Sequence, residues 1–189
     1  GTVIVNGKHV PINGIQDAKN NNIGFVPEDR IRDGIFLHQT IENNISANSI
    51  DRLVNKFNLL DEEKKQTLAK NWITRLNIKT PSRKLLAKKL SGGNQQRVVL
   101  AKTLANDPKI LILNSPTVGV DVGSKTEILK LVRDLANGGM GILLISDDIP
   151  ELMRTCDRII LMQNGKVKNA YMKDEIDEEK LNRAIVGEL

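Results

Sequence analysis

Cysteine and aromatic residues are scarce in this chain. A single cysteine, Cys156, occurs among 189 residues, which excludes a disulfide framework and a cysteine-rich zinc site and is typical of a reducing compartment. Aromatic residues make up 3% of the chain, too few for a surface that stacks single-stranded nucleic acid bases. The two histidines, His9 and His38, lie in no cluster with metal-ligand spacing, so we expect no metal site.

Long apolar runs and a strong charge bias are also missing. The longest apolar runs, such as Ile110–Leu113 and Ile142–Ile145, are far shorter than the roughly 20 residues of a membrane-spanning helix. Lys and Arg number 28 against 23 Asp and Glu, a net charge of +5, which is more typical of solvated surface lysines than of a nucleic-acid-binding stripe. With 40% hydrophobic and 27% charged residues, the composition is that of a globular domain.

The first 90 residues alternate between strand signals and helical periodicity. Asn6-Gly7 is a hairpin-turn dipeptide between apolar segments. Apolar positions recur with helical spacing between residues 46 and 88, as in the stripe of Leu68, Ala69, Trp72, Ile73 and Leu76. In order, we expect a β-hairpin over residues 2–12, a short helix after Asn13, a buried strand at Ile23–Val26, a polar, turn-like stretch at 28–45 and helices over 46–88.

The second half of the chain changes to a strand–helix rhythm. Asp107-Pro108 ends a helix that starts near Ser91. We expect strands at Ile110–Leu113, 141–146 and Ile159–Met162, a turn at Asn164-Gly165, and helices at about 124–136, near Glu151 and at about 177–186. Apolar strands that alternate with helices predict a parallel α/β sheet whose strands are buried on both faces.

One short stretch carries the chemistry: Leu90-Ser91-Gly92-Gly93-Asn94-Gln95-Gln96-Arg97. Glycines at a helix start let backbone amides approach a phosphate, the helix N-terminus adds partial positive charge, and Ser91 offers a hydroxyl. A Ser-Gly-Gly turn can also be a plain helix cap. The motifs that follow the next apolar strand narrow the choice, because Asn114-Ser115-Pro116-Thr117 and Gly119-Val120-Asp121-Val122 come there in order.

Together these motifs make the chain resemble the ATP-binding cassette (ABC) ATPases. Leu90–Gln96 is similar to their signature motif, Lys109–Ser115 to the Walker B strand, and Pro116–Asp121 to the segment leading into the D-loop. The resemblance implies a P-loop NTPase-like α/β core with a mostly parallel sheet and an added helical subdomain. It assigns residues 1–40 and 89–173 to the core, 41–88 to a helical subdomain that docks a permease, and 174–189 to a C-terminal helix.

More specific motifs in the chain resemble one branch of that family. Val26-Pro27-Glu28-Asp29-Arg30 with Gly34, Gly119–Gly123 and Asp148–Leu152 are similar to the second cassette of tandem ATPases for bacterial import of simple sugars such as ribose, galactose and xylose. Some nucleoside importers use closely similar subunits. The resemblance implies ATP and Mg²⁺ in the assembled transporter, a second cassette on the same polypeptide, permease subunits, and a place at the cytoplasmic face of the plasma membrane.

Cassettes that act on nucleic acid are a poorer match. Those of the DNA-repair or translation type carry coiled coils or long basic linkers at the position of residues 46–88, and this segment shows neither. We therefore expect no nucleic-acid partner.

The phosphate-binding loop of the family does not occur in the chain. No G-x-x-x-x-G-K-[ST] motif precedes Ile23. Gly119–Thr126 ends in Lys-Thr but has Ser124 where the loop needs glycine, and we interpret it as the D-loop and the start of a helix. The chain begins at Gly1 and its first methionine is Met140, so we expect an N-terminally incomplete cassette without the Walker A segment.

The positions that would act on Mg²⁺ and water are altered. The Walker B strand of the family ends in an Asp that positions Mg²⁺ and a Glu that activates water, where this chain has Asn114 and Ser115. Asp147 stands at the switch position, often His, and Glu28 at the Q-loop position. We expect no active catalytic residue and no metal ligand in this half-site.

An intact signature beside an altered Walker B predicts a division of labour between two cassettes. In the family, two cassettes close head to tail, and the signature of one completes the ATP site of the other. The hypothesis is that ATP held by a partner cassette is contacted by Ser91, Gly92, Gly93, Asn94 and Gln95, with Asp121 in the D-loop. The chain alone is then expected to be inactive and to hold no cofactor. The alternative is a purely structural, dimerising cassette that binds no nucleotide.

Overall fold

The chain forms two units, Gly1–Leu143 and Leu144–Leu189, in a computed structural model that describes residues 1–186. The first unit contains β1 (Val3–Val5), β2 (Lys8–Val10), α1 (Ile15–Asn20), β3 (Ile23–Val26), η1 (Arg30–Gly34), α2 (Ile41–Ser46), η2 (Ala47–Arg52), α3 (Glu62–Arg75), η3 (Ala87–Lys89), α4 (Gly92–Leu104), β4 (Ile110–Asn114) and α5 (Val122–Asn137). Strand β5 (Gly141–Ile145) runs over the boundary, and α6 (Ile149–Thr155), β6 (Arg158–Gln163), β7 (Lys166–Met172) and α7 (Glu178–Val186) follow. No helix among the described residues is long and apolar enough to cross a membrane.

The N-terminal hairpin confirms the turn prediction. β1 pairs antiparallel with β2, and Val3 lies opposite Val10. Asn6 and Gly7 adopt φ values of 51° and 74°, the left-handed backbone that a two-residue turn of type I′ requires. The short helix expected after Asn13 is also present, as α1.

The main sheet has the strand order β3-β4-β5. β3 and β4 are parallel, with Ile23 opposite Ile110, which confirms the parallel α/β prediction. Leu111 on β4 is fully buried, but Phe25 on β3 is 55% exposed and Leu143 on β5 is 49% exposed, so the prediction of strands buried on both faces is wrong for β3 and β5. Successive side chains of a strand point to opposite faces, and Gly24, the neighbour of Phe25 on β3, lies against Thr103 of α4.

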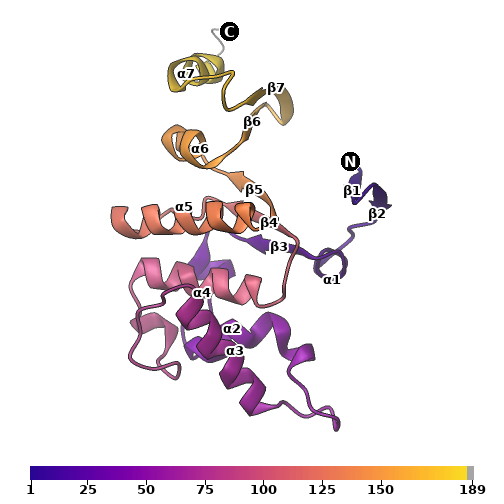
Figure 1. Cartoon of the computed structure of the whole chain (residues 1–189), viewed down its shortest axis with the longest axis vertical. Helices are drawn as coiled ribbons and strands as arrows, with labels where there is room; N and C mark the ends of the chain where they lie inside the picture. The colour runs from indigo at the N-terminus through magenta and orange to yellow at the C-terminus, as the bar shows by residue number, and fades with distance from the viewer. Residues whose placement is uncertain (187–189) are drawn as a thin grey trace. The chain divides into compact units, whose positions relative to one another are not determined.

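Helix α4 is the packing centre of the first unit. It contacts β3, α2, α3 and α5, and Figure 1 shows it between the sheet on one side and helices α2 and α3 on the other. Val98, Leu100 and Ala101 on this helix are fully buried. Burying a side chain such as Val or Leu stabilises a fold by about 1.5–3 kcal/mol. The packing of α4 therefore fixes the position of residues 91–95 at its N-terminus, which we call the signature segment.

Residues 28–45, expected to be polar and turn-like, contain two helical segments, the π-helical turn η1 and helix α2. Thr40 begins α2, because its hydroxyl accepts a hydrogen bond from the amide of Asn43 at 3.1 Å. Ile41 and Ile45 are fully buried. The expectation was wrong because two isoleucines one turn apart are too few to show a helical period.

The helical prediction for residues 46–88 is confirmed in part. The stretch holds η2, α3 and η3. In α3, Ala69 is buried, and Leu76 is buried just after the helix ends, whereas Trp72 is half-buried. The apolar stripe therefore faces inward, as its spacing predicted.

The second unit is a hairpin packed against two helices. β6 and β7 pair antiparallel, and the predicted turn at Asn164-Gly165 joins them with positive φ values. Ile149, Ile159, Ile176 and Leu181 form the core of this unit, with Cys156 packed against it. Strand β7 was not predicted, because its lysines and exposed positions hide the alternation that marks a strand.

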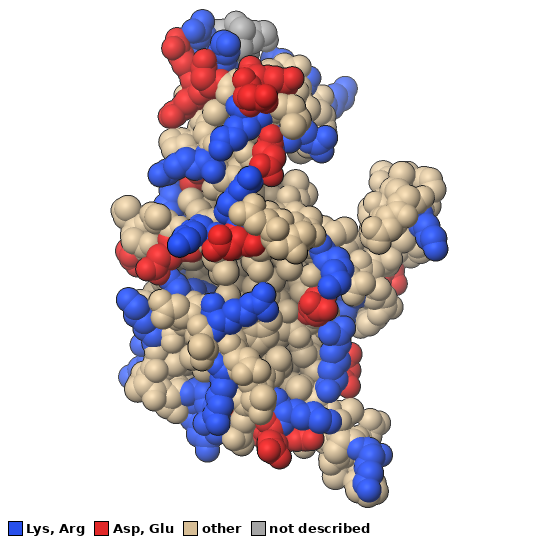
Figure 2. All heavy atoms as spheres, viewed as in Figure 1, with Lys and Arg blue, Asp and Glu red and all other residues tan. Residues whose placement is uncertain are grey.

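Charged side chains on the first unit form no single stripe on the face in Figure 2. Lys and Arg are scattered over its helices there and are interrupted by uncharged residues and by Asp and Glu. On this face the distribution is that of ordinary surface charge.

Candidate functional site

The signature segment begins helix α4 without a side-chain cap. Ser91 occupies the N-cap position in an extended conformation, and its hydroxyl makes no capping hydrogen bond. That hydroxyl instead accepts a hydrogen bond from the Asn94 side-chain amide at 3.0 Å. The first-turn amides of any α-helix lack intrahelical carbonyl partners, and Ser91 is exposed. The start of α4 therefore presents the Ser91 hydroxyl to solvent, whereas Gly93 in its first turn is buried.

The neighbouring helices of the first unit are capped in the ordinary way. Thr40 caps α2, Asp61 caps α3 and Asp121 caps α5, each by accepting from a backbone amide of the first turn. A serine at the N-cap position of α4 could do the same. That Ser91 does not cap α4 favours the phosphate-site interpretation of the segment over the plain-cap alternative.

The two signature glycines lie against the segment that precedes α5. A Cβ added at Gly92 would lie 2.9 Å from the carbonyl oxygen of Gly119, and one added at Gly93 would lie 2.5 Å from the Cβ of Ser124. Real Cβ atoms do not approach this closely. Packing thus gives both glycines a steric reason inside the chain, which sequence reasoning missed because it considered only their approach to a phosphate.

Asn94 and Gln95 connect the signature segment to residues that precede it in the chain. The Asn94 side-chain oxygen accepts from the amide of Lys79 at 2.8 Å. Gln95 is buried, and its side-chain amide donates to the carbonyl of Ala87 at 3.3 Å. These bonds hold the chain ahead of α4 onto the helix, while the contact of both side chains with nucleotide stays a prediction.

Asp121, the predicted D-loop residue, caps α5. Its carboxylate accepts from the Ser124 amide at 2.9 Å and from the Ser124 hydroxyl at 2.8 Å. These hydrogen bonds, the amide first, lower the pKa of Asp121 below its ordinary value. The segment Gly119–Thr126 is therefore a loop and a helix start, as interpreted from the sequence.

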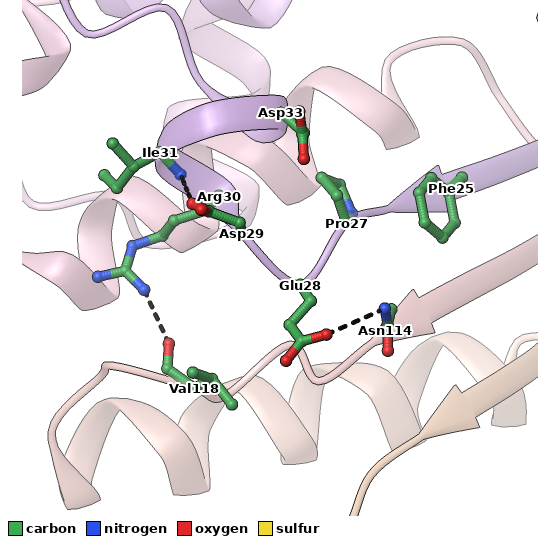
Figure 3. Close-up of a pocket in the computed structure, with 9 residues that line it drawn as sticks. All are labelled: Phe25, Pro27, Glu28, Asp29, Arg30, Ile31, Asp33, Asn114 and Val118. Atoms are coloured by element: carbon green, nitrogen blue, oxygen red, sulfur yellow. Dashed lines mark hydrogen bonds between the residues drawn. The ribbon is translucent and has the colours of Figure 1, made fainter.

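The altered Walker B position lies at the end of β4, in a pocket of about 610 Å³. The Asn114 side-chain amide donates to Glu28 at 3.5 Å (Figure 3), a long contact. Ser115 adopts a left-handed φ of 46°. The structure thus brings together Glu28 and Asn114, the residues predicted at the Q-loop and Walker B positions. Asp147 is exposed and belongs to the second unit.

Arg30 lines the same pocket; the sequence suggests it as a charge partner near the Q-loop position, and spacing alone gives it no role. Its guanidinium donates to the carbonyls of Val118 at 2.7 Å and Gly119 at 2.9 Å. Asp29 holds the backbone beside it by accepting from the amides of Ile31 and Arg32. A further signal in the sequence is that Arg30 is the last residue of Val26–Arg30, a segment that resembles the second cassette of sugar-importer ATPases.

Comparison with protein families and curated proteins gives a consistent result. A family model described as ABC transporter matches residues 1–118. The chain is 38% identical over 187 residues to "Ribose import ATP-binding protein RbsA" of Clostridium perfringens, covering 99% of this chain and 37% of that protein. It is also 38% identical over 187 residues to "Xylose import ATP-binding protein XylG" of Thermoanaerobacter pseudethanolicus, with the same coverage. The chain therefore spans a little over a third of the length of these relatives.

Solved structures show the same fold. A dimeric post-hydrolysis state of the ATP-binding cassette MJ0796 bound to ADP and Pi superposes with a TM-score of 0.75 at 22% identity, covering 92% of this chain and 73% of that one. The cbiO1 protein of Clostridium perfringens, part of the ABC transporter complex cbiONQ, gives a TM-score of 0.73 at 22% identity over 97% of this chain and 68% of that one. The fold is that of the ABC cassette, a P-loop NTPase fold with a parallel sheet and helices. The chain belongs to the ABC transporter family.

Proposed function

We propose that the chain is part of the ATP-binding subunit of a bacterial sugar importer, and that it presents its signature segment, Ser91–Gln95, to an ATP molecule held by a partner cassette. Sugar as the substrate class is supported by the names of its relatives, ribose and xylose import ATP-binding proteins. The alternative substrate class is nucleosides. The partner cassette is proposed to be on the same polypeptide.

The observation that carries this proposal is the contrast between the two halves of the site. The start of α4 is uncapped, and the exposed Ser91 accepts one hydrogen bond from Asn94, which leaves its hydroxyl proton able to donate to a phosphate. Amides of a helix N-terminus add further donors and a favourable dipole. This arrangement fits the terminal phosphate of ATP.

The end of β4 supplies no carboxylate of its own for Mg²⁺. The metal prefers carboxylate oxygens, and Asn114 offers an amide whose nitrogen faces Glu28. Ser115 carries no carboxylate that could activate water, and general-base assistance is worth about 10²–10⁴-fold. We therefore propose that this half-site is degenerate, with Asp147 at the switch position, and that Mg²⁺ and hydrolysis belong to the partner's Walker motifs.

The partner at the membrane is proposed to be a permease that docks on residues 41–88, beside a core of residues 1–40 and 89–173 and a C-terminal helix at 174–189. In support, α2 and α3 within 41–88 pack on each other and on α4, which makes a helical layer distinct from the sheet. The protein is proposed to lie at the cytoplasmic face of the plasma membrane.

A second candidate is a structural cassette that dimerises without touching nucleotide. The packing of Gly92 and Gly93 against residues 119–124 favours it, because that packing explains the glycines without a ligand. Calorimetric titration with ATP and Mg²⁺ bears on both candidates, since submillimolar binding by this chain alone contradicts both a structural cassette and a degenerate half-site.

The proposal is tested by the hydroxyl of Ser91 in the complete transporter. A hydrogen bond to a charged group contributes about 1.5–3 kcal/mol, so Ser91→Ala should lower ATP turnover by roughly 10- to 150-fold, whereas Ser91→Thr, which keeps the hydroxyl, should retain most of it. Restoring carboxylates with Asn114→Asp and Ser115→Glu should not rescue Ser91→Ala. Unchanged transport-coupled hydrolysis in Ser91→Ala refutes the proposal.

A further inference from the structure

We propose that Arg30 is a positioning residue for the signature segment, and that its guanidinium, by fixing the start of α4 against the segment ahead of Asp121, sets the rate of ATP hydrolysis in the assembled transporter. The inference rests on the proposed function, in which Ser91 and the first-turn amides of α4 contact ATP held by a partner cassette.

The first support is the forked hydrogen bond of Arg30. Nη1 donates to the Val118 carbonyl at 2.7 Å, the bond drawn in Figure 3, and Nη2 donates to the Gly119 carbonyl at 2.9 Å. A planar guanidinium serves two successive carbonyls at once, which the single ammonium of lysine does less well. The bond joins residues 88 and 89 positions apart in the sequence, so it fixes tertiary and not local structure.

The second support is the close packing around that fork. A Cβ at Gly119 would lie 3.0 Å from Nη1 of Arg30, and a Cβ at Gly92 would lie 3.0 Å from Nη2. Gly92 itself lies against the Gly119 carbonyl. The guanidinium, the carbonyl and the first residue of α4 thus meet with no room for a methyl group. A shift of Arg30 is therefore transmitted to the helix start.

The third support is that the backbone of Arg30 is itself held at both ends of η1. Asp29 caps the N-terminal end at 3.0 Å from two amides, and the Arg30 carbonyl accepts from the Ile35 amide at 2.8 Å. At the other end Lys102, a residue of α4, donates to the Gly34 carbonyl. The turn that carries Arg30 is therefore anchored on the same helix whose N-terminus Arg30 positions.

The expected consequence concerns rate more than affinity. A reacting group displaced by about 1 Å can cost about 10²-fold in rate. Without its guanidinium, the Val118 and Gly119 carbonyls lose their donor and a gap opens beside Gly92. ATP would still bind to the partner's motifs, so the KM for ATP should change little while kcat falls.

The test uses the complete transporter and measures kcat and KM for ATP. Arg30→Met should lower kcat by about tenfold or more with KM within about twofold, and Arg30→Lys should recover part of the loss. The matched control is Arg32→Met, which removes the same charge from the same turn, since the Arg32 side chain is 83% exposed and its nearest carboxylate, on Asp33, is 3.8 Å away. It should leave kcat unchanged. If Arg30→Met does not fold, Arg30→Lys alone should show a fall in kcat at constant KM.

Two results overturn the inference. An unchanged kcat in folded Arg30→Met, or an equal fall in Arg32→Met, shows that Arg30 does not position the signature. Ser91→Ala, measured beside them, separates this failure from failure of the proposed function. A loss of turnover in Ser91→Ala but not in the Arg30 variants refutes only the role of Arg30, whereas full turnover in Ser91→Ala refutes both.

Discussion

Replacing the signature glycine Gly93 with alanine should destabilise the first unit, whereas the same change at Gly123 should not. Both glycines occupy the second position of their helices, α4 and α5. Alanine is favoured over glycine in a helix by up to about 1 kcal/mol. At Gly123 the nearest atom to an added Cβ is 3.4 Å away, an ordinary contact, whereas at Gly93 the Ser124 Cβ is 2.5 Å away.

Overpacking of this kind costs about 1–3 kcal/mol, so the two variants should differ by about that amount in the free energy of unfolding. Trp72, the single tryptophan of the chain, lies on α3 in the first unit, and its fluorescence during urea unfolding reports on this unit. Ser124→Gly removes the obstructing side chain, so Gly93→Ala should cost much less in that background. Equal stability of Gly93→Ala and Gly123→Ala, or an undiminished cost beside Ser124→Gly, refutes the steric argument.

Two further predictions concern the supports of the site. The pKa of Asp121 is lowered in the folded chain. The ionised carboxylate therefore stabilises α5 above the unfolded carboxyl pKa, and this stability is lost as pH falls through the lower folded pKa. Acid unfolding of Asp121→Ala should show a weaker pH dependence than that of the parent chain, and an identical profile contradicts the capping role. Asn44 is fully buried. Its side chain bonds both the amide and the carbonyl of Phe36, at 2.7 and 3.0 Å, so Asn44→Ala should lower the free energy of unfolding by about 1–3 kcal/mol. Urea titration measures this loss, with Asn43→Ala, at a half-buried position of the same helix, as the control.

Much of the fold could be predicted because its signals are local. A pattern of a few neighbouring residues is enough to predict the turn at Asn6-Gly7, the apolar strand β4 and the apolar stripe on α5. Helix α2 and strand β7 could not be predicted in this way, because α2 is defined by burial against α3 and α4 and β7 by its pairing with β6. Such elements depend on partners that are distant in the sequence.

The candidate site divides along the same line. Ser91 was predicted from the Ser-Gly-Gly motif at a helix start, whereas Asn114 and Asp121 were predicted from the resemblance of their segments to the Walker B and D-loop motifs of the family. Arg30 was considered from the sequence only as a charge partner near the Q-loop position, because its partners are two carbonyls 88 and 89 residues away. The steric reason for Gly93 was likewise invisible until Ser124 was seen beside it.

The contact between Ser91 and ATP on a partner cassette is tested most directly by thiol protection. These 189 residues hold one cysteine, Cys156, so Ser91→Cys combined with Cys156→Ser, in a transporter from which every other cysteine has been removed, including those elsewhere on the same polypeptide, places a single reactive thiol at the exposed start of α4. We predict that ATP slows labelling of this thiol in the complete transporter and has no effect on labelling of the chain alone. A labelling rate that ATP does not change in the complete transporter contradicts the account.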